Sequence, residues 1–124
     1  VDKHIAYWRD GAQEDYEVAK ELVEKGRFQH ALFLCHLSVE KMLKAHVTRV
    51  EQDVPPKIHN LVSLAQMTQL TIDLDMMQFL RRLNPYQLLG RYADQSGAAA
   101  LSREHTQEMM HGAREILEWL NEKL

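Results

Sequence analysis

The stretch that decides the fold is residues 32–46, LFLCHLSVEKMLKAH, an apolar run with few charges. Apolar side chains on either side of it, beginning at Phe28, occupy most of the circumference of a helix. A helix that is apolar nearly all round must be covered on more than one side. We therefore predict a central helix over residues 28–51. Lys41 and Lys44 stand three residues apart and share one face of it, beside Glu40.

The chain before the central helix predicts a second long helix. Between residues 3 and 25, apolar side chains from Ile5 to Val23 recur at spacings of three and four, which is the period of a helix with one buried face. Gly26 follows, and glycine commonly ends a helix because it adopts the left-handed conformation without strain. We therefore predict that this helix ends at about residue 25.

The chain after the central helix predicts three shorter elements. Pro55 and Pro56 stop the central helix, because proline cannot continue a helix. Helices are predicted at about 61–70, 74–84 and 103–122, and the residues suited to cap their N-termini are Asn60, Asp73 and Ser102. Residues 86–100 are predicted as an irregular connection. The sequence therefore predicts an all-α fold, a five-helix up-and-down bundle, as a single domain over residues 1–124.

Composition excludes several classes of protein. The chain has one cysteine, Cys35, which rules out an intramolecular disulfide framework, and we expect it to be a buried core residue. No stretch reaches the roughly 18 apolar residues of a membrane span, and the first residues, VDKHIAYWRDG, hold no apolar signal core. We expect a cytoplasmic protein that does not interact with a membrane.

Charge is distributed unevenly along the chain. The net charge is −3, with −3 in residues 1–26, +2 in residues 27–94 and −2 in residues 95–124. The overall balance argues against general affinity for nucleic-acid backbone. The basic middle, however, predicts a surface that can receive an anion.

The candidate binding site draws on this middle segment. Lys41 and Lys44 on the central helix, Lys57 in the loop after it and Arg91 would hold phosphate oxygens, and His59 from the same loop would join them in the site. Tyr92 would stack on a base or donate its hydroxyl, and Asp94 would orient Arg91. The alternative is structural: the lysines are surface charges, His59 packs under its loop, and Arg91 and Asp94 form an ion pair.

Other chemistry finds little support in the sequence. The seven histidines include no pair spaced four apart on a helix, and there is no HExxH or Cys–His grouping, so we predict no metal site. The serines lie in no nucleophile elbow, and no glycine-rich phosphate loop is present, so no catalytic residue is assigned. We predict no cofactor.

Three segments taken in order resemble the HEPN domain family. They are SVEKMLKAH at 38–46, PPKIHNLVSL at 55–64 and LLGRYAD at 88–94, followed by the last long helix. Family members are similar in carrying lysines on the second helix, a loop ending in His-Asp-Leu and an Arg-Tyr-Pro-Asp motif. Here Asn60 stands at the position of that acid and Ala93 at the position of that proline.

The resemblance implies a five-helix bundle that forms a homodimer, in a bacterium or an archaeon. It also implies one of two roles. Many members are metal-independent ribonucleases with an Arg-x(4–6)-His motif, and others bind nucleotides beside a minimal nucleotidyltransferase, in some cases as a toxin–antitoxin pair. No arginine of this chain is followed by a histidine at the ribonuclease spacing; Arg103 and His111 have seven residues between them.

The sequence therefore predicts a nucleotide-binding partner of a nucleotidyltransferase. The residues expected to bind the nucleotide or phosphate ligand are Lys41, Lys44, His59, Arg91, Tyr92 and Asp94. Two alternatives stay open: a divergent ribonuclease that acts on RNA, and a helical dimerisation module whose polar cluster is structural.

Overall fold

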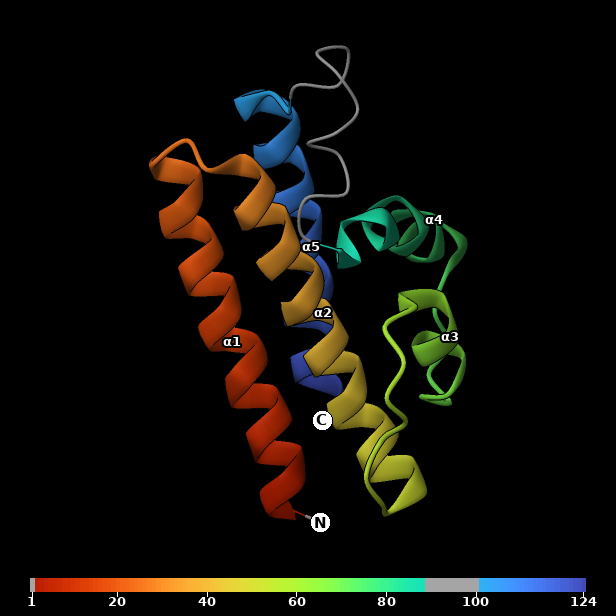
Figure 1. The fold of residues 1–124 in the computed structure, drawn as a ribbon. Helices are drawn as coiled ribbons and strands as arrows, with labels where there is room; N and C mark the ends of the chain where they lie inside the picture. The colour runs from red at the N-terminus through yellow and green to blue at the C-terminus, as the bar shows by residue number, and fades with distance from the viewer. Residues whose placement is uncertain (1, 89–100) are drawn as a thin grey trace.

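The fold consists of helices arranged around α2 (Figure 1). The computed structural model describes residues 2–88 and 101–124. The elements in chain order are α1 (Asp2–Glu24), α2 (Phe28–Glu51), α3 (Leu61–Gln66), α4 (Leu74–Leu83), the 3₁₀ turn η1 (Asn84–Gln87) and α5 (Arg103–Lys123). The predicted all-α fold with five α-helices is confirmed.

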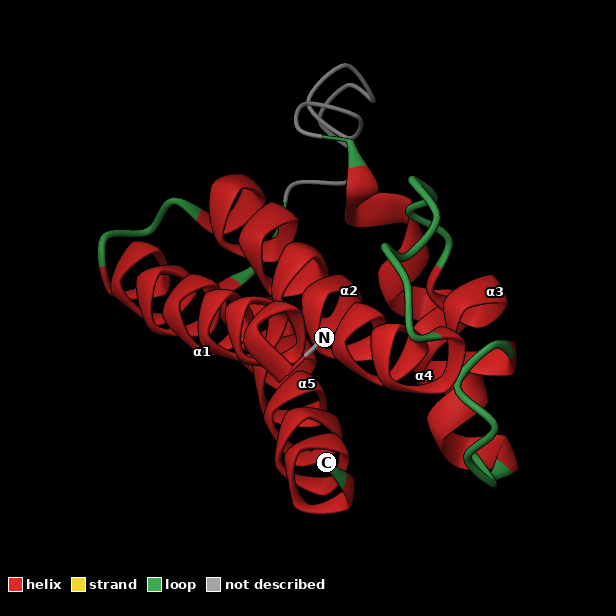
Figure 2. Cartoon of the chain, turned by 90° about the horizontal axis from the view of Figure 1, so that it is seen from below, coloured by secondary structure: helices red, strands yellow, loops and turns green. Residues whose placement is uncertain are grey.

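Helix α2 lies at the centre, because its neighbours cover it on three sides. Helix α1 packs along one side, α5 along a second, and α3 with η1 along a third. Seen along the helices from below, α1, α2 and α5 form a group of three, with α3 and α4 beyond α2 (Figure 2). In the C-terminal halves of α2 and α5, the His46 side chain meets the carbonyl oxygen of Leu120 at 2.7 Å.

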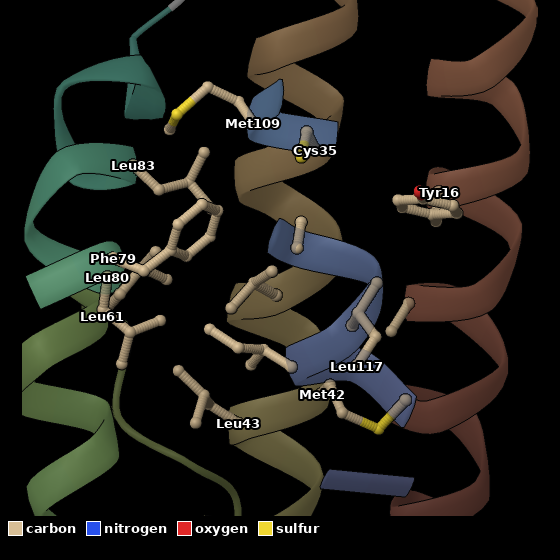
Figure 3. Packing of buried hydrophobic residues seen from close by; sticks show 14 of the residues in the cluster. Tyr16, Cys35, Met42, Leu43, Leu61, Phe79, Leu80, Leu83, Met109 and Leu117 are labelled. Atoms are coloured by element: carbon tan, nitrogen blue, oxygen red, sulfur yellow. The ribbon is translucent and has the colours of Figure 1, made fainter. Parts of the chain in front are cut away.

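The core lies where α2 meets these neighbours (Figure 3). Leu32, Leu43 and Leu80 are almost completely buried, as is Cys35, the predicted buried cysteine. Burial also raises the pKa of the Cys35 thiol to about 12, so this side chain is neutral and unreactive. Tyr16 on α1 donates its hydroxyl to the carbonyl oxygen of Met110, 2.9 Å away, and so ties α1 to α5.

The ends of the helices follow the predicted signals. Gly26 adopts φ +74° after α1. The side chains of Asn60, Asp73 and Ser102 each accept a hydrogen bond from the backbone N–H three residues later, as N-caps do. None of the helices within residues 2–88 and 101–124 is long and apolar enough to cross a membrane.

Two boundaries differ from the sequence prediction. Helix α3 ends at Gln66, four residues early, because the Thr68 hydroxyl donates to the Ala65 carbonyl and Gln69 turns into the left-handed region at φ 64°. Pro85 lies inside η1, a single 3₁₀ turn that continues directly from α4. Proline is tolerated there because the first turn of a helix leaves its N–H groups unpaired.

A glycine in α5, Gly112, leaves room for the Phe79 ring of α4. A Cβ atom built on Gly112 would overlap the ring of Phe79. Gly112→Ala should therefore destabilise the protein by about 1–3 kcal/mol, although alanine is the better helix former by about 1 kcal/mol. Urea denaturation measures the change.

The matched control is Gly11→Ala in α1. The added Cβ there would lie 3.3 Å from Cδ of Lys41, a flexible side chain that can move aside. This variant should be neutral or slightly more stable. Equal loss of stability in both variants would contradict the role assigned to Gly112.

Candidate functional site

The candidate site is built around Glu40, a buried carboxylate on α2. Its exposed fraction is 4%, and that of Lys44, one turn further along, is 5%. The Lys44 ammonium lies 3.0 Å from Oε2 of Glu40. His59, from the loop before α3, approaches with Nδ1 at 3.1 Å from Oε1 and 3.2 Å from Oε2. We call His36, Glu40, Lys44 and His59 the Glu40 cluster.

The local sequence explains how α2 contributes three members of this cluster. His36, Glu40 and Lys44 follow at intervals of four, so their side chains lie one above another on a single face. His36 Nδ1 lies 3.8 Å from Oε1 of Glu40, which is beyond hydrogen-bond distance. The Glu40–Lys44 pair is therefore the strong contact on this face.

Two asparagines hold the loop that carries His59. The Asn60 side chain accepts from the N–H of Ser63 and so begins α3. Asn84, at the start of η1, donates from Nδ2 to Oδ1 of Asn60 at 3.2 Å and accepts from the N–H of Leu61 at 2.8 Å. The loop is therefore fixed at both α3 and η1, and this places His59 against Glu40.

Burial decides the charges within the cluster. It lowers the pKa of His36 to about 4, against the opposing effect of the nearby Glu40 carboxylate, so His36 is neutral at pH 7. Lys44 is desolvated and lies 5.6 Å from the centre of the Trp8 ring, in a cation–π contact. The Glu40–Lys44 pair is neutral as a unit, and the excess charge of the cluster depends on His59.

His59 is the member that meets solvent. The exposed fraction of its side chain is 61%. When the imidazole is neutral, its Nδ1–H donates to Glu40 and Nε2 carries the lone pair; when it is protonated, Nε2–H can donate to an anion. The cluster therefore presents one oriented imidazole that can hold an anion or exchange a proton.

Lys41 belongs to a separate ion pair. Its ammonium lies 2.8 Å from Oδ2 of Asp15 on α1, and both side chains are largely buried. Lys41 and Lys44 are therefore not ordinary surface charges, as the structural alternative had them, because each lies against a carboxylate. Lys57 is exposed in the loop before His59.

The remaining predicted residues are Arg91, Tyr92 and Asp94, and all three lie outside the residues that the structure describes. Of the six predicted site residues, the described part of the structure therefore brings together Lys44 and His59, which each contact Glu40. Sequence reasoning missed His36 and Asn84. The spacing of four from His36 to Glu40 to Lys44 was a signal for the first, whereas nothing local marks Asn84.

Three hollows lined by described residues lie away from the Glu40 cluster. One of about 310 Å³ lies between α1 and α5 and is lined by Tyr16, Lys20, His111 and Arg114, among others. It contains none of the residues predicted from the sequence. Within residues 2–88 and 101–124, no group of three or more His, Cys, Asp or Glu side chains is placed to hold a metal ion.

Comparisons with known proteins agree with this architecture. The sequence model of the HEPN domain matches residues 5–123. TT1696 from Thermus thermophilus has a similar structure, with a TM-score of 0.82, 21% identity and coverage of 97% of this chain and 98% of that one. ST0689, described as an archaeal HEPN homologue, gives a TM-score of 0.75 at 22% identity, with 96% of each chain covered. Among curated proteins, no sequence matches significantly.

The Glu40–Lys44 pair leads to a prediction on stability. Lys44→Met leaves the Glu40 carboxylate buried without its main cation and should cost about 3–5 kcal/mol of unfolding free energy. Adding Glu40→Gln removes that charge and should restore part of the loss. Urea denaturation of both single variants and the double variant measures the coupling.

Lys41→Met is the control for this cycle, because Lys41 and Asp15 keep more contact with water. It should cost less than Lys44→Met, because the exposed fractions of the Lys41 and Asp15 side chains, 24% and 16%, exceed the 7% and 5% of Lys44 and Glu40. If the double variant loses as much as the sum of its two single variants, Glu40 and Lys44 are not energetically coupled.

Two buried histidines lead to a prediction on pH. Burial lowers the pKa of His36 to about 4 and also lowers that of His46, whose Nε2–H donates to Leu120. The unfolded chain therefore binds more protons than the folded one below about pH 6.5, and stability falls as the pH drops from about 6.5 to 4. The shift at His36 corresponds to a loss of about 3 kcal/mol.

Urea denaturation at pH 7, 6 and 5 measures this slope. His36→Gln should flatten it, whereas His111→Gln, at a histidine whose side chain is 62% exposed, should leave it unchanged. A slope that is the same in His36→Gln as in the unmodified protein would assign the acid sensitivity to other groups.

Proposed function

Because the chain belongs to the HEPN domain family, we propose that it is a nucleotide-binding helical domain and a non-catalytic partner of a minimal nucleotidyltransferase. The observation that carries the proposal is His59, an exposed imidazole oriented by the buried Glu40. The proposal extends to a homodimer, since HEPN domains commonly dimerise. The proposal includes a toxin–antitoxin pair, in which this domain would be one member and the nucleotidyltransferase encoded beside it the other.

The contacts with phosphate follow from the charges of the cluster. Lys44 neutralises Glu40, so the carboxylate does not repel an approaching phosphate as strongly as a free acid would. Nε2 of His59 points away from the Glu40 contact made by Nδ1, so a protonated imidazole would donate from it to a phosphate oxygen. Lys57, exposed two residues earlier, adds a second cation on the same loop.

The structure leads us to divide the roles of the predicted residues. We assign direct contact with phosphate to His59, and a positioning role to Lys44, which holds Glu40 and through it His59. Lys41 would act in the same indirect way through Asp15. Arg91, Tyr92 and Asp94 keep the roles predicted from their sequence motif: phosphate contact, base stacking and orientation of Arg91.

One observation favours a second candidate, the divergent ribonuclease. Cutting RNA without a metal ion needs a group that transfers protons and a cation near one phosphate. His59 held by a carboxylate fits the first requirement. No arginine of the chain has a histidine at the Arg-x(4–6)-His spacing of the family's ribonucleases, so nucleotide binding is the stronger proposal.

A thermal-shift screen tests the proposal with ATP, GTP, CTP, UTP, their monophosphates and inorganic phosphate. At a ligand concentration of about 100 Kd, binding to the folded state adds about 2.7 kcal/mol, or roughly 10 °C in Tm for a domain of this size. His59→Gln and Arg91→Ala should remove most of the shift. These positions are preferable to Lys44, whose removal would also lower stability.

His111→Gln is the matched control, because its side chain is 62% exposed, as His59 is at 61%, and it lies on α5. It should leave the shift intact. No shift with any compound would favour the dimerisation module. Cleavage of RNA in EDTA that is lost in His59→Gln would favour the ribonuclease, and failure to copurify with a nucleotidyltransferase encoded beside its gene would remove that partner.

A further inference from the structure

A groove runs where α1 meets α5, and it consists of two adjoining hollows. Their volumes are about 310 Å³ and about 230 Å³. Tyr16, Lys20 and Arg114 line both hollows, which therefore adjoin at these side chains. We call the larger hollow, which Val23 and Met110 also line, the α1–α5 pocket. Its size lies at the lower end of the range of small-molecule sites, which is about 300–1,000 Å³.

The floor of the α1–α5 pocket is apolar. Tyr16, Val23 and Met110 have exposed fractions of 9%, 7% and 6%. Figure 3 shows the Tyr16 ring pointing from α1 toward the other helices. Its hydroxyl donates to the Met110 carbonyl oxygen, 2.9 Å away, so these two polar groups satisfy one another. Burial raises the pKa of this hydroxyl to about 12, so Tyr16 is neutral and adds no negative charge. The floor therefore suits the apolar body of a ligand.

The rim of the pocket carries more positive than negative charge. Lys20 approaches the pocket from α1 and Arg114 approaches it from α5, whereas Glu24 is the one acid among the described residues that line it. The smaller hollow differs, because Glu17 and Glu118 balance the same two cations there. Of the two hollows, the α1–α5 pocket is therefore the one that favours an anion.

Contacts along α5 hold the Arg114 guanidinium in position. Its Nη2 donates to Nδ1 of His111, one turn earlier, at 3.3 Å. Nε2 of His111 lies 3.4 Å from Glu115, and Nε of Arg114 lies 3.9 Å from Glu118. A guanidinium has five N–H donors, so these contacts leave several of them for a ligand. A guanidinium oriented in this way can bind a carboxylate through two parallel hydrogen bonds.

Lys20 is the second cation, and it comes from the opposite helix. Its ammonium lies 3.2 Å from Oε2 of Glu17, also on α1, and 53% of the Lys20 side chain is exposed. Exposed ion pairs contribute little stability, so an incoming anion can compete with Glu17 for this ammonium. One anionic group of a ligand can therefore meet Lys20 from α1 and Arg114 from α5.

Met110 favours an aromatic body for this ligand. The thioether sulfur of methionine makes favourable contacts with aromatic rings, and the flexible side chain adapts to their shape. A ring on the floor would also lie close to the two cations of the rim, which are attracted to an aromatic face. A ligand that joins a ring to a carboxylate therefore matches both the floor and the rim.

We propose that the α1–α5 pocket binds a small aromatic carboxylate. The carboxylate lies between Lys20 and Arg114, and the ring lies on Val23 and Met110. None of the described residues that line this pocket belongs to the Glu40 cluster. The inference therefore goes beyond the proposed nucleotide site and does not rest on it.

Phenylacetate is the probe that tests this proposal, and NMR of the methionine methyl groups is the measurement. The Met110 signal should shift and reach saturation as phenylacetate is added, because the ring lies against the thioether. The signal of Met76, on α4, should not move. Phenylacetamide has the same ring without the charge and should bind at least about tenfold more weakly. Acetate, which lacks the ring, should leave the Met110 signal in place.

Substitutions on the rim test the contact with the carboxylate. Arg114→Gln should weaken phenylacetate binding at least about tenfold, because it removes the cation that binds the carboxylate. Lys20→Gln removes the cation of α1 and should also weaken binding. Arg81→Gln, at an exposed arginine on α4, is the matched control and should leave the Kd unchanged. All three positions are exposed, so each variant should fold, and circular dichroism checks this.

The outcomes that would overturn the proposal are distinct from those that decide nucleotide binding. A Met110 signal that phenylacetate does not move would overturn the site. Equal affinity for phenylacetate and phenylacetamide, or an unchanged Kd in folded Arg114→Gln, would overturn the carboxylate contact. Loss of phenylacetate binding in His59→Gln would place the ligand at the Glu40 cluster instead. Nucleotide binding is decided separately, by the thermal shift with nucleotides and phosphate.

Discussion

The burial of α2 on three sides is the constraint on which the rest of this structure depends. Its apolar circumference needs α1, α5 and the α3–η1 segment around it, and these neighbours set the arrangement of the fold. Every polar side chain on such a helix then needs a partner, because burying an unpaired charge is costly. Glu40 with Lys44 and His46 with Leu120 are results of this requirement.

The same burial explains why the Glu40 cluster is a site as well as a structural contact. A buried ion pair contributes little net stability, because desolvation offsets the attraction between the charges. Its clearer effect is geometric. Glu40 has a fixed position on a rigid helix, and the loop carrying His59 is held by Asn60 and Asn84. The contact with Glu40 therefore fixes the orientation of the exposed His59 imidazole. A ligand that meets His59 meets a group that has already lost its freedom of orientation.

The sequence predicted the fold more fully than the site. Helical periodicity and capping residues placed α1, α2 and α5 to within two residues at each end, because those signals are local. The early end of α3 depends on the left-handed conformation of Gln69, which no side-chain preference indicates. The spacing of three between Lys41 and Lys44 predicted that they share a face of α2. It did not predict that Lys44 is buried, because its burial depends on Trp8 and on a loop 15 residues away. The cross-links made by Asn84 are non-local in the same way, and Arg91, Tyr92 and Asp94 lie outside the described residues.

Two ion pairs of α2 connect the Glu40 cluster with helix α1. Lys41 and Lys44 lie one turn apart, the first against Asp15 on α1 and the second against Glu40 on α2. The Trp8 ring of α1 lies against the Lys44 ammonium and limits its contact with water. Removing water strengthens the attraction between Lys44 and Glu40, because the effective dielectric constant falls. The packing of α1 on α2 therefore helps to hold Glu40, and with it His59, in place.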